Sequence, residues 1–185
     1  TSDVPLLDSE ALQALLEEHN RKPRAAVTVL TSTADNPHGY GRIVRNADGE
    51  VLRIVEEKDA SDEEREITEV NSGVYAFDAE TLANALKQLD TNNAQGELYL
   101  TDVIGIAREA DRSVRGHRLA DATVVAGVND RVQLATLGRE LNRRTCEAAM
   151  RAGATIVDPD TTWIDVEVEI GRDVTILPGT QLHGK

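Results

Sequence analysis

The sequence predicts an α/β domain followed by a long helix and the start of a parallel β-helix, and three patterns support this prediction. Strand-like runs alternate with amphipathic segments over residues 1–128, which is typical of an α/β layered domain. One helical pattern covers residues 129–152 and stops at Gly153, because glycine commonly terminates helices. Residues 153–185 then place apolar side chains at a six-residue period. We therefore expect three parts with these boundaries.

The first part carries signals for its individual elements. Its opening residues, TSDVPLL, have the character of a strand end with Pro5 at the exit, and Asp8 or Ser9 can cap the helix that follows. The apolar face of that helix is expected to carry Ala11, Leu12, Leu15 and Leu16. The apolar face of the long helix is expected to carry Leu134, Leu137, Leu141 and Ala148. Strands are expected at residues 25–32, 69–78, 113–119 and 123–128, and a hairpin at Asp48-Gly49. A further helix is expected at residues 79–89, and the run at residues 96–110 continues into another.

The last part has a period that belongs neither to a helix nor to a flat strand. The residues that recur every six positions are Ile164, Ile170, Ile176 and Leu182. A β-helix explains this period, because each short strand forms one side of a coil. The alternative is two ordinary strands joined by a turn at Pro178-Gly179.

Composition excludes several classes of partner. The chain has 33 acidic and 20 basic residues, a net charge of -13, and shows no Lys/Arg-rich face, so we expect no nucleic-acid partner. Its apolar runs are too short to span a membrane. Cys146 is the only cysteine, which prevents an internal disulfide and fits a cytoplasmic location. An anionic ligand would need a cation to mediate its binding.

The two ends of the sequence are abrupt. The chain starts at what looks like the end of a strand and stops in the middle of a six-residue repeat. We therefore expect it to be a piece of a longer protein, with material missing at both ends.

Two residues could hold a metal ion. Asp3 would lie at the carboxyl end of a strand, where open α/β sheets bind ligands, and its carboxylate could ligate Mg²⁺. Asn129 begins the long helix, and its amide oxygen could join the same ion. Both residue types also cap helices and turns, and spacing alone favours that structural role.

A polar sugar site is suggested by the segment NPHGYGRIV, residues 36–44. Two glycines around Tyr40 would let the backbone at Gly41 approach a ligand without an intervening side chain. Glu56 and Asn71 follow at strand ends, where a carboxylate can accept from sugar hydroxyls and an amide can donate or accept. Each also has an ordinary role as a surface or turn residue.

Six motifs in order give the chain a resemblance to a known family. They are DVPLL, GYGRIV, IVEEKDA, EVNSGVYAFD, NNAQGELYLTDVI and GVNDRVQLA. Together with the repeats that follow, they resemble the bacterial bifunctional N-acetylglucosamine-1-phosphate uridylyltransferase / glucosamine-1-phosphate N-acetyltransferase over essentially all 185 residues. The resemblance implies a Rossmann-like nucleotide-diphospho-sugar transferase domain, present in part, then a helix and a left-handed β-helix that acetylates glucosamine-1-phosphate with acetyl-CoA and forms a homotrimer.

The resemblance also implies roles for individual residues. Asp3 and Asn129 match the ligands of a shared Mg²⁺, which reverses the preference for a capping role. Gly41, Glu56 and Asn71 match residues that contact the N-acetylglucosamine group, and Tyr99 and Thr101 line the same pocket. Thr1 and Ser2 fall where the family contacts the nucleotide sugar. Ser2 replaces a usual glycine, and Asp130 replaces a usual asparagine.

The implied reaction joins UTP and N-acetylglucosamine-1-phosphate to give UDP-N-acetylglucosamine, a cell-wall precursor, and pyrophosphate. The family's phosphate-binding loop and its uracil-binding residues are not among the 185 residues, so we expect no activity from this chain alone. Two alternatives remain. One is a related sugar-1-phosphate nucleotidyltransferase that uses another base or sugar, and the other is a non-catalytic module that binds sugar phosphate or trimerises.

Overall fold

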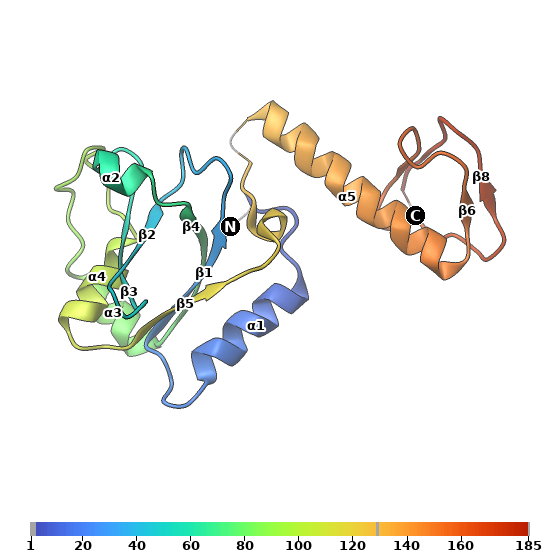
Figure 1. Cartoon of the computed structure of the whole chain (residues 1–185). Coiled ribbons are helices and arrows are strands. Elements are labelled where there is room, and N and C mark those ends of the chain that lie inside the picture. Colours follow the sequence, from blue (N-terminus) through green and yellow to red (C-terminus); the bar gives the residue numbers. More distant parts are fainter. Residues whose placement is uncertain (1–2, 129, 185) are drawn as a thin grey trace. The chain divides into compact units, whose positions relative to one another are not determined.

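The computed structural model describes residues 3–128 and 130–184 of the chain. They form two compact units, Thr1–Gly127 and Val128–Lys185, and each has its own core (Figure 1). Among the described residues, no helix is both long and apolar enough to cross a membrane.

The first unit is a five-stranded sheet with helices on both faces. Its strands are β1 (Val27–Thr33), β2 (Arg42–Arg45), β3 (Val51–Val55), β4 (Glu69–Phe77) and β5 (Val114–Arg118), in the order β3-β2-β4-β1-β5. Its helices are α1 (Ser9–Asn20), α2 (Asp62–Arg65), α3 (Ala79–Leu86), α4 (Asp102–Glu109) and the short 3-10 helix η1 (Ala122–Val125). Only β1 and β5 pair in parallel, and the other pairs are antiparallel.

Side chains that alternate along β1 contribute to two core layers, one on each face of the sheet. Val27 and Val29 pack on the side of α4, with Ile104 of that helix, whereas Leu30 packs on the side of α1, with Leu15. Successive side chains of a strand point to opposite faces, so one strand supplies both layers. Helices therefore cover both faces of the sheet, which confirms the expected α/β layering.

Two expectations for the start of the chain need correction. Residues 3–8 contain no strand, and Asp3 lies in a turn. Asp8 does cap α1, because its Oδ1 accepts from the backbone N–H of Ala11 at 2.8 Å, but Leu12 and Leu16 are exposed. The buried side of α1 is made instead by Ala11, Leu15 and His19, spaced four residues apart.

The run TVVAGV, expected to be a strand, begins instead with the 3-10 helix η1. The Asp121 side chain accepts from the backbone N–H of Thr123 at 2.9 Å, which starts a tight turn. Val124 and Val125 then reach the core on the α1 side as part of that turn. A β-branched composition had suggested a strand, but a local side-chain hydrogen bond favours the turn.

The second unit consists of one long helix and four two-residue strands. They are α5 (Arg131–Ala152), β6 (Thr155–Ile156), β7 (Trp163–Ile164), β8 (Thr175–Ile176) and β9 (Gln181–Leu182). Asp130 caps α5 through a 2.7 Å bond from the N–H of Gln133, and Gly153 ends it with φ +112°. The expected long helix and its stop at Gly153 are therefore observed.

The strands of the second unit pair in parallel, β6 with β8 and β7 with β9. Ile164 is paired with Leu182, three six-residue periods further along the chain. The strands on either side of the turn at Pro178-Gly179, β8 and β9, do not pair with each other, because each pairs in parallel with an earlier strand. Ile156, Ile164 and Ile176 point inward and pack on Cys146 of α5.

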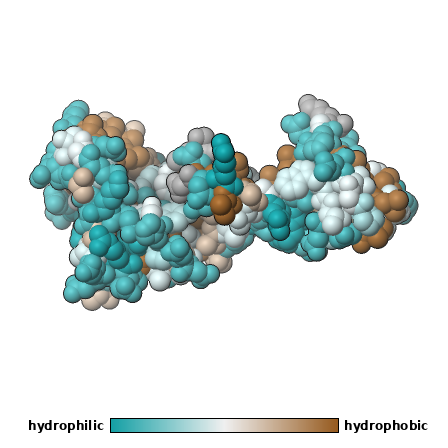
Figure 2. All heavy atoms as spheres, turned by 90° about the horizontal axis from the view of Figure 1, so that it is seen from above, coloured by the Kyte–Doolittle hydropathy of each residue, from teal (hydrophilic) through white to brown (hydrophobic). Residues whose placement is uncertain are grey.

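The buried side of α5 also differs from the expected stripe. Leu137, Asn142 and Cys146 are buried, whereas Leu134 is 56% exposed. The surface of the chain is mostly hydrophilic, with separate hydrophobic areas on each unit (Figure 2). The exposed large hydrophobic residues of the second unit include Val157, Trp163, Val166, Val174 and Leu177.

Candidate functional site

Strand pairing in the first unit brings three of the predicted sugar-site residues together. Gly41 directly precedes β2 and Glu56 directly follows β3, and these strands pair so that Arg42 lies opposite Val55. The carbonyl oxygen of Gly41 accepts from the backbone N–H of Asn71 at 2.8 Å. Residues distant in sequence thus meet at one end of the hairpin.

A side chain at position 41 would be tightly packed. A Cβ atom there would lie 3.0 Å from Cγ2 of Ile54 and 3.4 Å from both carboxylate oxygens of Glu56. The first distance is shorter than most contacts that Cβ atoms make. The sequence-based reason for this glycine was access of a ligand to the backbone, and the structure adds close packing against Ile54 as a second reason.

The Glu56 carboxylate is held in place by a hydrogen bond from the start of α4. The hydroxyl group of Thr101, the residue before α4, donates to Oε1 of Glu56 at 2.9 Å. Thr101 is buried, so this hydrogen bond fixes one oxygen of the carboxylate. A carboxylate has further acceptor sites, and these remain for a ligand hydroxyl.

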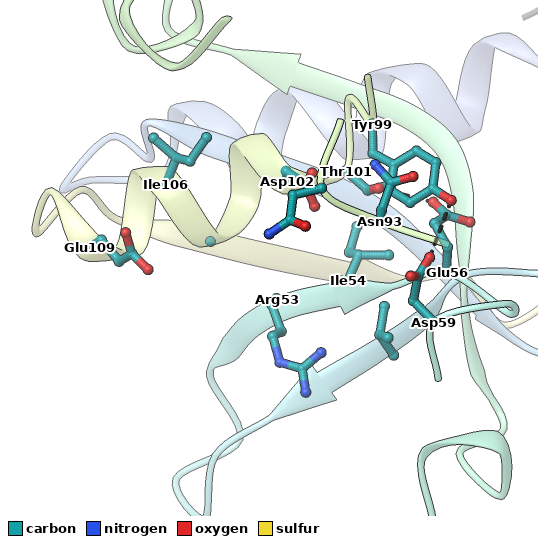
Figure 3. A pocket seen from close by; sticks show the side chains of 13 residues that line it. Arg53, Ile54, Glu56, Asp59, Asn93, Tyr99, Thr101, Asp102, Ile106 and Glu109 are labelled. Carbon is teal, nitrogen blue, oxygen red and sulfur yellow. Dashed lines mark hydrogen bonds between the residues drawn. The ribbon is translucent and has the colours of Figure 1, made fainter. Parts of the chain in front are cut away.

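Glu56, Tyr99 and Thr101 line a hollow of about 380 Å³ between β3 and α4 (Figure 3). The Tyr99 hydroxyl donates to Asp59 at 3.1 Å and accepts from Gln95 at 2.8 Å, so the protein already engages it. Figure 3 shows Glu56, Asp59 and Tyr99 gathered at one end of this hollow. The predicted residues Tyr99 and Thr101 therefore do lie beside Glu56.

The electrostatics of this hollow are acidic. Four carboxylates line it, from Glu56, Asp59, Asp102 and Glu109, with a single arginine, Arg53, which pairs with Glu64. Burial, followed by the charges of Asp90 and Asp59, raises the pKa of Asp102. Such a surface disfavours a phosphate group and suits neutral hydroxyl groups.

Asn71 lies at an irregularity of β4. The register between β1 and β4 shifts between Val29 and Thr31, so β4 bulges there, and Gly73 in the bulge has φ +74°. Asn71 lines a second hollow of about 180 Å³, together with Tyr40. Gly41 lies close to a residue of each hollow: a Cβ added to it would lie 3.4 Å from the Glu56 carboxylate, and its carbonyl oxygen accepts from the backbone N–H of Asn71.

Sequence reasoning missed the ion pair that fixes the glycine loop. The Arg42 side chain is only 2% exposed, and its guanidinium donates to Glu57 at 2.6 Å and to the carbonyl oxygen of Tyr40. Glu57 also accepts from the N–H of Gly39 at 3.2 Å. Burial raises the pKa of Glu57, but the bonds from Arg42 and Gly39 outweigh this effect and lower it. The only signal in the sequence was the arginine within GYGRI, and its burial is seen only in the structure.

The predicted metal site falls largely outside the described residues. Thr1, Ser2 and Asn129 are not described, and Asp3 is exposed. The capping role considered for Asn129 is performed by Asp130. Within residues 3–128 and 130–184, no cluster of three or more His, Cys, Asp or Glu side chains is arranged to hold a metal ion.

Comparison with known proteins shows similarity over almost the whole chain. A family model described as "Nucleotidyl transferase" matches residues 2–166. Three proteins called "Bifunctional protein GlmU" match 98–99% of the chain: 71% identity in Corynebacterium efficiens, 67% in Corynebacterium glutamicum and 64% in Rhodococcus jostii. The chain spans only 37–38% of the length of these relatives.

Solved structures are less similar. A putative glucose-1-phosphate thymidylyltransferase from Bacillus anthracis, in complex with sucrose, aligns with 70% of this chain and 48% of its own, at 18% identity and a TM-score of 0.49. This likeness is too low to support a conclusion about fold or function.

Proposed function

Because the chain belongs to the nucleotidyl transferase family, we propose that it is part of an enzyme that makes UDP-N-acetylglucosamine from UTP and N-acetylglucosamine-1-phosphate. The 64–71% identity to bifunctional relatives over almost the whole chain supports this reaction. The observation that carries the proposal is the connected set of Gly41, Glu56, Asn71 and Thr101, which the resemblance had assigned to the sugar.

The described residues would hold the sugar half of the substrate. Glu56 would accept from a sugar hydroxyl, while the backbone at Gly41 and the amide of Asn71 approach from the neighbouring hollow. The acidic lining fits the uncharged N-acetylglucosamine ring and would keep phosphate groups outside the hollow of Glu56. These contacts would hold the sugar phosphate while one of its oxygens displaces pyrophosphate from the α-phosphorus of UTP.

Asp3 and Asn129 would hold Mg²⁺, which would neutralise phosphate charge during this displacement. A carboxylate and an amide oxygen are suitable ligands, since Mg²⁺ takes few protein oxygens and keeps water or phosphate in its other positions.

The second unit would begin the other half of a bifunctional protein. We assign residues 1–128 to the uridylyltransferase domain, 129–152 to a linker helix and 153–185 to the start of a left-handed β-helix. Parallel pairing of β7 with β9, offset by three six-residue periods, supports the β-helix, whereas β6 and β8 pair in parallel at an offset of 20 residues. The complete protein would acetylate glucosamine-1-phosphate with acetyl-CoA, act in the cytoplasm and form a homotrimer.

The test is calorimetric titration of the chain with UDP-N-acetylglucosamine, with and without Mg²⁺. Glu56→Ala and Asn71→Ala should each weaken binding at least tenfold, since each removes a hydrogen bond to the sugar. Glu63→Ala is the matched control, because Glu63 is an exposed residue of α2 and should leave the affinity unchanged. Equal affinity of all four proteins would contradict the assignment of the sugar site.

A further inference from the structure

The hydroxyl group of Tyr75 lies against the side chain of Asn71 within the bulge of β4. Its oxygen is 2.9 Å from Oδ1 of Asn71, and the backbone nitrogen of Gly73 is also 2.9 Å from that atom. A backbone N–H can only donate, so the Asn71 atom facing Gly73 must be the amide oxygen rather than the nitrogen. The Tyr75 hydroxyl, which faces the same oxygen, must then donate as well.

This arrangement leaves Asn71 with one chemical role toward a ligand. Both lone pairs of its oxygen are engaged by Gly73 and Tyr75. Its amide nitrogen makes no side-chain hydrogen bond within the part of the chain that the structure describes, and Asn71 lines the smaller hollow. Asn71 therefore offers N–H donors and no acceptor.

Glu56 offers the opposite polarity. One of its oxygens is engaged by Thr101, and an ionised carboxylate can only accept. The site therefore presents a donor from Asn71 and an acceptor from Glu56, on either side of Gly41. A hydroxyl or carbonyl oxygen suits the donor, and a hydroxyl or amide hydrogen suits the acceptor.

Tyr75 is well suited to fix the Asn71 amide. Its ring stacks on Phe77 with 5.3 Å between the ring centres, so the hydroxyl has a fixed position. Burial raises the pKa of Tyr75, as does the nearby charge of Glu56, although the bond to Asn71 acts in the opposite direction. The raised pKa favours the protonated phenol, which is the form that donates.

We propose that Tyr75 is a positioning residue that fixes the orientation of the Asn71 amide, and thereby selects a sugar whose hydrogen-bond acceptor faces Asn71. This inference rests on the proposed function of the site as the N-acetylglucosamine pocket. Tyr75 itself acts through Asn71 and need not touch the ligand.

The test is a double-mutant cycle on the affinity of the chain for UDP-N-acetylglucosamine. Tyr75→Phe keeps the stacked ring and removes only the hydroxyl, so it should weaken binding about three- to tenfold, the value of one hydrogen bond. Asn71→Ala should weaken binding more. If Tyr75 acts through Asn71, adding Tyr75→Phe to Asn71→Ala should change the affinity no further.

A general loss of packing would give a different pattern. Phe77→Leu is the control, because it disturbs the same stack but keeps the Tyr75 hydroxyl. Phe77→Leu should lower the melting temperature more than Tyr75→Phe does, yet weaken binding less. Additive effects of Tyr75→Phe and Asn71→Ala, or an unchanged affinity of Tyr75→Phe, would overturn the inference while leaving the proposed function intact. A wild-type chain that does not bind the probe would refute both.

Discussion

Asn142 should stabilise the second unit more than any exposed residue of α5. Its Nδ2 donates to the carbonyl oxygen of Thr162 at 2.8 Å, and its Oδ1 accepts from the N–H of Ile164 at 2.9 Å. Asn142 is 7% exposed and Thr162 is 1% exposed, so water cannot replace these bonds. The residues on either side of Ile164, Trp163 and Asp165, donate their backbone N–H groups to the carbonyl oxygens of Thr180 and Leu182, whereas the N–H of Ile164 donates to Asn142 of α5.

Replacing Asn142 with leucine would put an apolar side chain of similar size in its place and leave two buried backbone groups without partners. Each such group costs about 1–3 kcal/mol, so Asn142→Leu should lower the free energy of unfolding by about 2–6 kcal/mol. Thr136→Ala, at an exposed position of the same helix, should change it by less than about 0.5 kcal/mol.

Urea unfolding followed by tryptophan fluorescence measures this directly. The chain has one tryptophan, Trp163, and it lies in β7 beside the affected hydrogen bonds. Its signal therefore reports on the second unit. A loss of stability below about 0.5 kcal/mol in Asn142→Leu would refute the reasoning, because it would mean that the two bonds contribute nothing net.

Asn142→Asp provides a second test, in which the stability of the variant is measured as a function of pH. The carboxylate can still accept from Ile164 but cannot donate to the carbonyl oxygen of Thr162. Protonation of the new carboxyl restores a donor, so the deficit of this variant relative to wild type should shrink as the pH falls. A deficit that is independent of pH would contradict this role of the Thr162 bond.

Three further predictions follow from the first unit. Gly41→Ala should weaken binding of UDP-N-acetylglucosamine at least tenfold in calorimetry, because its Cβ would press on Ile54; unchanged affinity would contradict the close packing. Arg45 and other donors hold the pKa of the buried Glu69 at about 2 despite its desolvation, so the stability that this carboxylate contributes, about 3 kcal/mol, should be present above pH 4.5 and lost as the pH falls toward 2. Unfolding measured across this range should show a smaller pH dependence in Glu69→Gln, and equal slopes would refute the assignment. Burial lowers the pKa of His19, so wild-type stability should fall as the pH drops below 6.5, and His19→Gln should reduce this loss in thermal melts; identical profiles would count against it.

The sequence predicted those elements whose signals are local. Asp8 caps α1 where a cap was expected, and the turn at Gly49 joins the hairpin strands with φ +82° at the glycine. These features depend on hydrogen bonds between residues a few positions apart, so they can be recognised without the fold.

Packing faces were predicted less well, because burial depends on which tertiary neighbour an element meets. In α5 a polar residue, Asn142, occupies the buried side, while the apolar Leu134 remains exposed. The hydrophobic pattern assumes that apolar residues point inward, and it cannot show that a backbone group of β7 needs a side-chain partner. The prediction of a strand at residues 123–128 was wrong for a similar reason, since composition alone did not reveal the turn at Asp121.

For the predicted site, too, individual residues could be named from the sequence, but their tertiary contacts could not. Gly41, Glu56, Asn71 and Thr101 were named from motifs, and strand register brings them together. The partners that orient them were not predicted, since those contacts depend on the bulge of β4 for Tyr75 and on burial of the Arg42 side chain. Neither feature can be read from spacing in one sequence.

Binding of the sugar end of UDP-N-acetylglucosamine by this chain can be tested directly by saturation-transfer NMR, because this method reports which ligand protons touch the protein. We expect strong transfer to the N-acetylglucosamine protons, weak transfer to the uracil protons, and loss of the sugar signal in Asn71→Ala. Stronger transfer to uracil than to the sugar, or an unchanged sugar signal in Asn71→Ala, would contradict binding through the sugar end.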